Sequence, residues 1–240
     1  MPQKNAPLRW SGYDWTVKSG DKLGPGPNRW KSENVRLDAQ GRLHLTVGQD
    51  ASGWACGEIA CTRRFHFGLY EFHTVFPLER LDPNLVVGLF NYPPREVGPD
   101  QTNEIDIEWS RWGDPKFPAG NFTLWPGKVG AKSVSHTFEP PPGIVEATHR
   151  FWWLPDRIVW QCLRGHVRQQ EQKGEFARWE FKPTADSGLI PQQPLPLLIN
   201  FWLMRGRPPQ NNSEETVIVS RFAYYSTKEI KSVPRQENTR

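Results

Sequence analysis

The stretch from Glu104 to Trp109 alternates strictly between acidic and apolar residues. In a β-strand, side chains two positions apart point to the same face of the sheet. The stretch therefore predicts a strand with Glu104, Asp106 and Glu108 on one face and two isoleucines and a tryptophan on the other. The apolar face would pack into a core. The acidic face would bring together three negative charges, whose mutual repulsion opposes ionisation.

The rest of the chain is built from short apolar stretches separated by turn residues. Its 240 residues include 20 Gly and 23 Pro, which are spread along the whole length, and no stretch keeps a helical periodicity. Such spacing is typical of many short strands, and it predicts an all-β fold of two stacked antiparallel sheets. Without an internal repeat or a linker, residues 1–240 are expected to form a single domain, with 1–7 as a loose terminus.

Individual strands can be assigned from apolar alternation between turn signals. Residues 35–37 and 43–47 flank Asp-Ala-Gln-Gly and predict a hairpin. Residues 65–76 predict one long strand, in which the aromatic alternation changes phase at Gly68, as at a β-bulge. Further strands are expected at 85–92, 103–110, 121–125, 150–154, 157–163, 197–204 and 216–225.

Charge and cysteine content restrict the partners and the setting. The net charge of +4 comes from scattered Lys and Arg, so no nucleic-acid partner is expected, and an anionic polysaccharide gains equally little support. No apolar stretch is long enough to span a membrane, and no signal peptide follows Met1. We expect an extracellular or periplasmic protein if a signal peptide has been removed, and a cytoplasmic one otherwise. Cys56, Cys61 and Cys162 are interpreted as buried thiols, with a Cys56–Cys61 bond left open.

Three carboxyls on one strand face can carry glycosidic chemistry. Cleavage with retention uses two carboxyls about 5–5.5 Å apart. Cα atoms four residues apart on a strand lie roughly 13 Å apart, and leaning side chains and sheet curvature would shorten the distance between Glu104 and Glu108. Asp106 lies between them and could hydrogen-bond to the glutamate that acts as nucleophile. The pattern alone equally allows a solvated strand face, or a site for a hard cation completed by Asp100 and Asp114.

The residues around the acidic strand narrow these alternatives. Asn103-Glu104-Ile105-Asp106-Ile107-Glu108 resembles the catalytic strand of glycoside hydrolase family 16, in the form without a bulge found in licheninases and xyloglucan transglycosylases. Several further segments resemble that family in the same order: Gly57–Ile59, Phe67–Glu71, Gly88–Tyr92, Thr148–Trp160 and Asn200–Trp202.

The resemblance carries definite implications. It implies a jelly-roll β-sandwich with an open polysaccharide cleft, in which Glu104 is the nucleophile, Asp106 its assisting carboxylate and Glu108 the acid/base. It implies no organic cofactor. Some members of the family bind a structural calcium, but no metal ligand is predicted for this chain.

The resemblance also implies a set of sugar contacts. Pyranose rings stack on aromatic planes, and their hydroxyls require polar partners. Most of the 12 Trp are expected in the core. His66, His73, His136 and His149 lack metal-ligand spacing and are interpreted as structural. The predicted sugar contacts are Asn28, Glu58, Phe90, Tyr92, Asn121, Asn200 and Trp202.

The chain departs from the licheninases at several positions. Ala60 stands where they carry an arginine that contacts sugar, and Thr123 stands where they carry a tyrosine. Thr102-Asn103 replaces an aromatic residue before the catalytic strand. Cys56 has a counterpart in those enzymes, but residues 28–30 supply no partner cysteine. These changes leave the three acids intact and leave the linkage of the substrate open.

The sequence therefore predicts a retaining endo-glycosidase, expected to be a monomer, that acts on β-1,3-1,4- or β-1,3-glucan. Three alternatives stay open. A transglycosylase would replace water by a sugar acceptor, and a galactan hydrolase would use the same acids on another polymer. A non-catalytic carbohydrate-binding protein could use the same fold, because fold does not dictate function.

Overall fold

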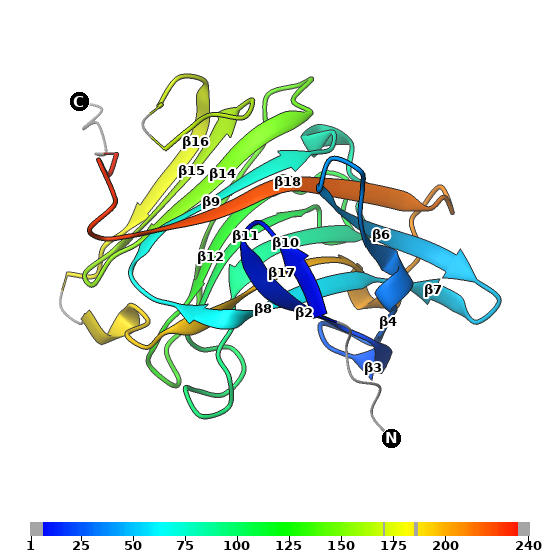
Figure 1. Cartoon of the computed structure of the whole chain (residues 1–240), viewed down its shortest axis with the longest axis horizontal. Coiled ribbons are helices and arrows are strands. Elements are labelled where there is room, and N and C mark those ends of the chain that lie inside the picture. Colours follow the sequence, from blue (N-terminus) through cyan, green and yellow to red (C-terminus); the bar gives the residue numbers. More distant parts are fainter. Residues whose placement is uncertain (1–6, 170, 185–186, 235–240) are drawn as a thin grey trace.

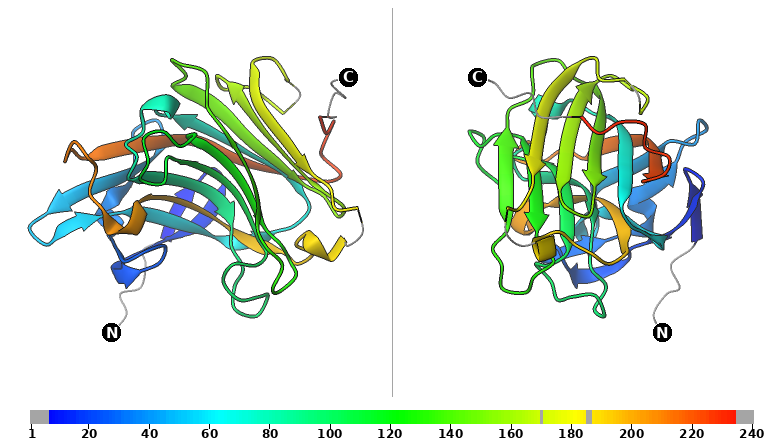
Figure 2. Two further views of the ribbon diagram at one scale, coloured as in Figure 1. Left: turned by 180° about the vertical axis from the view of Figure 1, so that it is seen from behind. Right: turned by 90° about the vertical axis from the view of Figure 1, so that its left-hand side faces the viewer.

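The computed structural model describes residues 7–169, 171–184 and 187–234. In this part of the chain two large antiparallel sheets pack face to face, and their long strands are bent (Figures 1 and 2). The predicted β-sandwich is therefore confirmed. The described residues contain short 3-10 turns but no helix long and apolar enough to cross a membrane.

The first sheet carries the acidic strand near one edge, and its strand order is β1-β2-β8-β17-β10-β11-β12-β13. The bounds are β1 Pro7–Trp10, β2 Tyr13–Val17, β8 Gly57–Phe65, β10 Leu85–Asn91, β11 Glu104–Ser110, β12 Gly120–Trp125, β13 Val134–Phe138 and β17 Leu195–Leu203.

The second sheet covers the inner face of the first, and its order is β16-β15-β14-β9-β18-β6-β5, with β7 paired to β6. The bounds are β5 Val35–Leu37, β6 Leu43–Asp50, β7 Gly53–Ala55, β9 Gly68–Val75, β14 Glu146–Trp153, β15 Ile158–Arg164, β16 Glu175–Phe181 and β18 Glu215–Ser226. A separate hairpin pairs β3 (Gly20–Leu23) with β4 (Asn28–Trp30). The 3-10 turns are η1 Ser32–Asn34, η2 Leu78–Arg80, η3 Ser187–Leu189 and η4 Met204–Gly206.

The core lies between the two sheets and fixes which face of β11 looks outward. Ile105, Ile107 and Trp109 are fully buried in the apolar cluster between the sheets. Trp160 on the opposite sheet donates its indole N–H to the backbone oxygen of Asp106 at 3.0 Å. The alternation predicted for this strand is thus realised, and its acidic face points away from the core.

The long strand predicted at 65–76 is wrong, because the chain changes sheets within it. β8 ends at Phe65 in the first sheet, and β9 begins at Gly68 in the second. The phase change in the aromatic alternation marks this crossing rather than a bulge. A Cβ at Gly68 would lie 2.4 Å from the Tyr225 backbone oxygen, so a residue without a side chain is required there.

Two further sequence-based expectations can be compared with the structure. The loose terminus expected at 1–7 lies outside the described residues except for Pro7, which begins β1. Cys56, Cys61 and Cys162 are buried free thiols, so the bond left open between the first two is absent.

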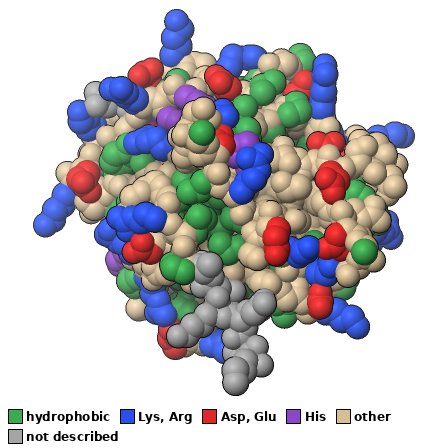
Figure 3. Space-filling model, turned by 45° about the vertical axis from the view of Figure 1, so that its right-hand side comes forward, with side chains coloured by type: hydrophobic (Ala, Val, Ile, Leu, Met, Phe, Trp, Pro, Cys, Tyr) green, Lys and Arg blue, Asp and Glu red, His purple; other side chains and the backbone are tan. Residues whose placement is uncertain are grey.

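Lys and Arg are spread over the face in Figure 3 and interspersed with Asp and Glu.

Candidate active site

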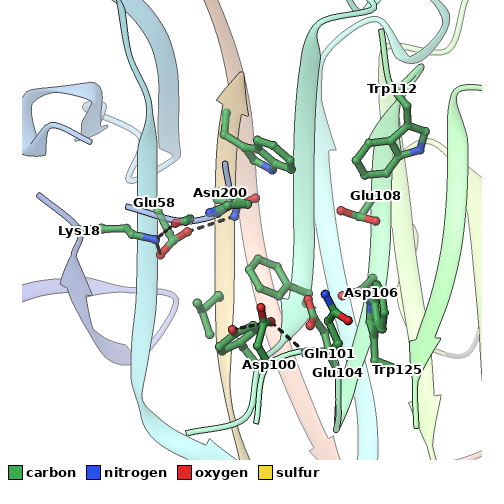
Figure 4. Close-up of a pocket in the computed structure, with 16 residues that line it drawn as sticks. Lys18, Glu58, Asp100, Gln101, Glu104, Asp106, Glu108, Trp112, Trp125 and Asn200 are labelled. Atoms are coloured by element: carbon green, nitrogen blue, oxygen red, sulfur yellow. Dashed lines mark hydrogen bonds and ion pairs between the residues drawn. The ribbon is translucent and has the colours of Figure 1, made fainter. Parts of the chain in front are cut away.

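A cavity of about 530 Å³ lies on the outward face of the first sheet, directly over the acidic strand. Figure 4 shows its lining side chains, which come from β8, β17, β10, β11 and β12 and from the loops beside them. The lining residues are Lys18, Gly24, Pro25, Glu58, Phe90, Tyr92, Asp100, Gln101, Glu104, Asp106, Glu108, Trp112, Trp125, Leu198, Asn200 and Trp202.

The three acids of β11 share this cavity in the order in which they follow along the strand (Figure 4). Asp106 is almost fully buried, and Glu104 and Glu108 are partly exposed. The interaction between the two carboxyl groups lowers the pKa of Glu104 and raises the pKa of Asp106. One carboxyl oxygen of Asp106, Oδ2, is buried and has no hydrogen-bond partner. The site thus holds acidic groups that burial and mutual repulsion keep from ionising freely.

The pKa values of these groups follow from that environment. Burial, followed by the charge of Glu108, raises the pKa of Glu104 to about 8. Burial raises the pKa of Glu108 to about 7. Burial and the two neighbouring glutamates raise the pKa of Asp106 well above its usual value. The three groups interact, so near neutral pH they share protons as one cluster.

Strand register places Glu108 in a row of residues that crosses the sheet. Glu58 on β8 faces Asn200 on β17, which faces Gly88 on β10, which faces Glu108 on β11. Gly88 leaves the centre of this row without a side chain. A Cβ there would lie 2.4 Å from Asn200 Oδ1. The missing side chain keeps the floor of the cavity open between the acidic strand and the polar pair on its other side.

That polar pair is tightly connected. Asn200 donates from Nδ2 to Glu58 Oε2 at 3.1 Å, and Lys18 Nζ lies 2.9 Å from Glu58 Oε1. Burial raises the pKa of Glu58, and the Lys18 charge opposes this effect. Asn200 Oδ1 is buried without a partner, so it remains free to accept a hydrogen bond from a ligand.

Aromatic side chains form the walls of the cavity. Trp202 and Trp112 lie on one side, with ring centroids 6.4 Å apart, and Phe90 and Tyr92 meet edge to face at 6.3 Å. Trp112 has a φ of 51°, in the left-handed region that bulky residues rarely adopt, and such strain is found at functional sites. With Trp125 near Glu104, the acidic row lies between surfaces that suit sugar rings.

Five of the seven predicted sugar contacts line the cavity: Glu58, Phe90, Tyr92, Asn200 and Trp202. Asn28 and Asn121 do not line it. Asn28 is buried and donates from Nδ2 to the backbone oxygens of Pro25 and Leu203. Asn121 accepts from the Trp112 indole N–H through Oδ1 at 3.2 Å. Both asparagines support residues beside the cavity, and their predicted contact with sugar stays a prediction.

Sequence reasoning missed Lys18, Trp112 and Trp125 as parts of the site. Trp125 pairs directly with Glu104 across β11 and β12, so the strand prediction at 121–125 contained the necessary signal. Trp112 follows the acidic strand closely and has no periodicity to mark it. Lys18 approaches Glu58 only because β2 pairs with β8, a contact that no local pattern reveals.

The structure also bears on the alternative of a cation site. Asp100 accepts from Tyr92 and from the backbone N–H of Gln101, and Asp114 caps a turn by accepting from the backbone N–H of Lys116. Among the described residues, no group of three or more His, Cys, Asp or Glu side chains is arranged to hold a metal ion.

Comparisons with known proteins show which solved structures share this architecture. No family model and no curated protein matches the sequence. A solved β-glucanase of Bacillus licheniformis superposes with a TM-score of 0.66 at 18% identity, covering 93% of this chain and 99% of the other. A glycoside hydrolase family 16 endo-glucanase from Bacteroides ovatus gives 0.64 at 11% identity, covering 88% and 94%.

A third solved structure with the same fold belongs to a protein of a different kind. It is described as a pseudo β-1,3-glucanase of Mycobacterium tuberculosis, and it superposes with a TM-score of 0.63 at 17% identity, covering 85% of this chain and 88% of the other. At these identities the matches establish the architecture and not the activity. This chain has the β-sandwich fold of the β-glucanases of glycoside hydrolase family 16.

Proposed function

We propose that this chain is a member of glycoside hydrolase family 16 and a retaining endo-glycosidase that hydrolyses a β-linked glucan. The observation that carries the proposal is the row of Glu104, Asp106 and Glu108 in an aromatic-walled cavity. A structural strand face gains nothing from three neighbouring acids with raised pKa values, whereas acid/base chemistry near neutral pH uses groups of this kind.

The reaction proceeds by two displacements at the anomeric carbon. In the first, a carboxylate oxygen of Glu104 attacks that carbon while Glu108 gives its proton to the departing glycosidic oxygen. In the second, Glu108 takes a proton from water, whose oxygen attacks the same carbon and releases Glu104. The assignment of nucleophile and acid to these two residues follows the family resemblance of the strand.

Asp106 provides the charge distribution that this reaction needs. The nucleophile must be ionised, although burial raises the pKa of Glu104 to about 8. The Asp106 carboxyl has a pKa raised well above its usual value, so it keeps the proton of the pair and donates it in a hydrogen bond to Glu104. In this arrangement Glu104 carries the negative charge beside a neutral Asp106, and Glu108 carries the proton that the first displacement uses.

The cavity suits a neutral polymer such as a β-1,3-1,4- or β-1,3-glucan. Of the described residues lining it, only Lys18 is cationic, and its charge is balanced by Glu58. An anionic galactan would meet the acidic row without a free cation to receive it. A transglycosylase would use the same acids with a sugar acceptor in place of water.

A carbohydrate-binding protein without catalysis is the second candidate. It is favoured by one observation, namely that a pseudo β-1,3-glucanase shares the fold. Against it stands the complete row of acids on β11, which a binding surface does not need.

The two candidates are separated by measuring reducing-sugar release from mixed-linkage β-glucan, laminarin, xyloglucan, agarose and κ-carrageenan. The parent protein is assayed beside Glu104→Gln. We expect release from a β-glucan by the parent and none above background by the variant. Binding of a glucan without release by either protein, with both folded, would overturn the hydrolase and support the binding protein.

A further inference from the structure

The row of residues that crosses the cavity floor from Glu108 to Glu58 extends one residue further, to Lys18. Lys18 follows β2 directly, and its backbone N–H donates to the backbone oxygen of Glu58 at 3.0 Å, so it lies beside Glu58 in the sheet. The order across the sheet is then Lys18, Glu58, Asn200, Gly88 and Glu108. Beyond Lys18 the chain leaves the sheet and forms the β3–β4 hairpin.

Lys18 ties this hairpin to the floor. Its ammonium group lies 2.9 Å from Glu58 Oε1 and donates to the Gly24 backbone oxygen in the hairpin turn at 2.5 Å. It also lies over the Trp30 ring, 4.3 Å from the centroid. One side chain therefore holds the floor, the turn and a buried aromatic residue together. Figure 4 shows it reaching Glu58 from the side of the cavity away from the acidic row.

The contacts of Lys18 with Glu58 and the turn set the length of the cavity floor on this side of Glu108. Neighbouring strands lie about 4.8 Å apart, so the three strand spacings from Glu58 to Glu108 measure roughly 14 Å, about two to three sugar rings. Gly24 and Pro25 line the cavity at the end beyond Glu58. A longer chain must leave the floor there and pass over the turn.

We propose that Lys18 is a specificity-determining residue that ends the sugar-binding floor on the β8 side. By holding Glu58 and the Gly24–Pro25 turn, it limits the binding on that side of the cleavage point to about two to three rings. This inference rests on the proposed glycosidase, because it assigns a length limit to the same cavity.

The test is a length series of linear β-gluco-oligosaccharides, with kcat/KM determined for each length. In the parent, kcat/KM rises with length and then becomes constant once the floor is filled. Lys18→Met removes the link between the turn and Glu58, while Asn28 still donates to the Pro25 oxygen, and we expect kcat/KM to keep rising by about threefold or more for the next longer oligosaccharide. Limit digests of mixed-linkage β-glucan by this variant should contain longer products. Lys18→Arg keeps the charge and should restore the parental length limit.

Lys22→Met is the matched control, because Lys22 is an exposed residue of the same hairpin and does not line the cavity. It should leave the length limit unchanged. A Lys18→Met protein with lower stability and the parental length limit would overturn the proposal, since Lys18 would then be structural only.

Binding separates this proposal from the proposed function. If the parent cleaves no glucan, the same oligosaccharides are titrated calorimetrically against the parent and Lys18→Met. An affinity that becomes constant with length in the parent and rises further in the variant supports the length limit without catalysis. Equal length dependence in both proteins, or no binding to either, overturns it.

Discussion

A buried acid on the second sheet and the row of acids on the first sheet have opposite surroundings. On the second sheet, Glu71 is fully buried and accepts from Arg150 Nε at 2.9 Å and from Arg221 Nη1 at 2.7 Å. Burial alone would raise the pKa of Glu71, but His73 and the two arginines outweigh it and lower that pKa. On the first sheet, the acids of β11 have raised pKa values, and no arginine is among the described residues that line their cavity.

The difference separates a structural use of buried charge from a chemical one. Arg150 also donates to the backbone oxygens of Val167, Arg168 and Glu171, so the Glu71 network fastens a loop to the outer face of the second sheet. Its charges are satisfied and fixed. The β11 acids are left able to gain and lose protons, which a reacting group requires and a structural group avoids. Substitutions at equivalent places in the two groups should therefore affect different properties.

The largest expected effect is on turnover at the first sheet. Glu108→Gln removes the proton that leaves with the glycosidic oxygen, so kcat/KM on β-glucan should fall by about 10³–10⁴-fold. Initial rates of reducing-sugar release measure this effect. Glu71→Gln is the matched control and should keep the parental rate per folded molecule. A Glu108→Gln rate within tenfold of the parent's would contradict the acid/base role.

The next effect is on stability at the second sheet. Glu71→Gln leaves the fully buried Arg150 guanidinium without its counter-charge, and loss of one partner of a buried pair costs about 3–5 kcal/mol. Unfolding in urea, followed by tryptophan fluorescence, measures the free energy of unfolding. Glu108→Gln should show no such loss. Equal stability of the two variants would show that the Glu71 network is no more structural than the acidic row.

An effect of similar size and opposite sign is expected for Glu104→Gln. The pKa of this group rises on folding from 4.5 to about 8, so the folded state holds the proton more tightly. Its contribution to stability is therefore present at low pH and is lost as pH rises between these two values. At pH 8 the variant should be more stable than the parent by about 4 kcal/mol, or by about 8–16 °C in Tm.

Thermal melts of parent and variant between pH 4 and 8 measure this difference, which should shrink toward the acidic end. A variant that is less stable than the parent at pH 8 would show that the ionised Glu104 is stabilised in the fold rather than opposed by it.

The smallest effect lies in the pH profile of the parent. Glu108 must be protonated and Glu104 must be ionised, and their pKa values are about 7 and about 8, so kcat/KM should be highest between these two values and decline toward tenfold per unit above pH 8. Rates on soluble β-glucan across a pH series measure the decline. A rate that stays constant up to pH 9 would place the proton on another group.

Local pattern was enough to predict the acidic strand and the fold class. Ile105 and Ile107 are buried and the acids beside them face the cavity, because a period of two leaves only one arrangement once one face is apolar. The 65–76 strand failed for a physical reason. A crossing between sheets and a bulge both shift the phase of alternation, and only Tyr224 and Tyr225, far along the chain, distinguish them at Gly68.

The remainder of the site depends on strand pairing. Lys18, Glu58 and Asn200 come together because β2, β8 and β17 are neighbours in the sheet, although Glu58 and Asn200 lie 142 positions apart. The resemblance supplied Glu58 and Asn200, but Lys18 belongs to no recognised motif. Asn28 and Asn121 illustrate the opposite case. An asparagine has the chemistry to bind a sugar, and only the structure shows that these two bind backbone oxygens near the cavity.

The position of β18 in the second sheet determines when the molecule can be completed during synthesis. This strand pairs with β6 on one side and β9 on the other, so residues 215–226 fill the middle of the sheet. Until the ribosome has released them, the growing chain carries β6 and β9 with unpaired edges, which invite association with other chains. A chain that ends before β18 should therefore be bound by chaperones, whereas a chain that includes β18 can pair both edges.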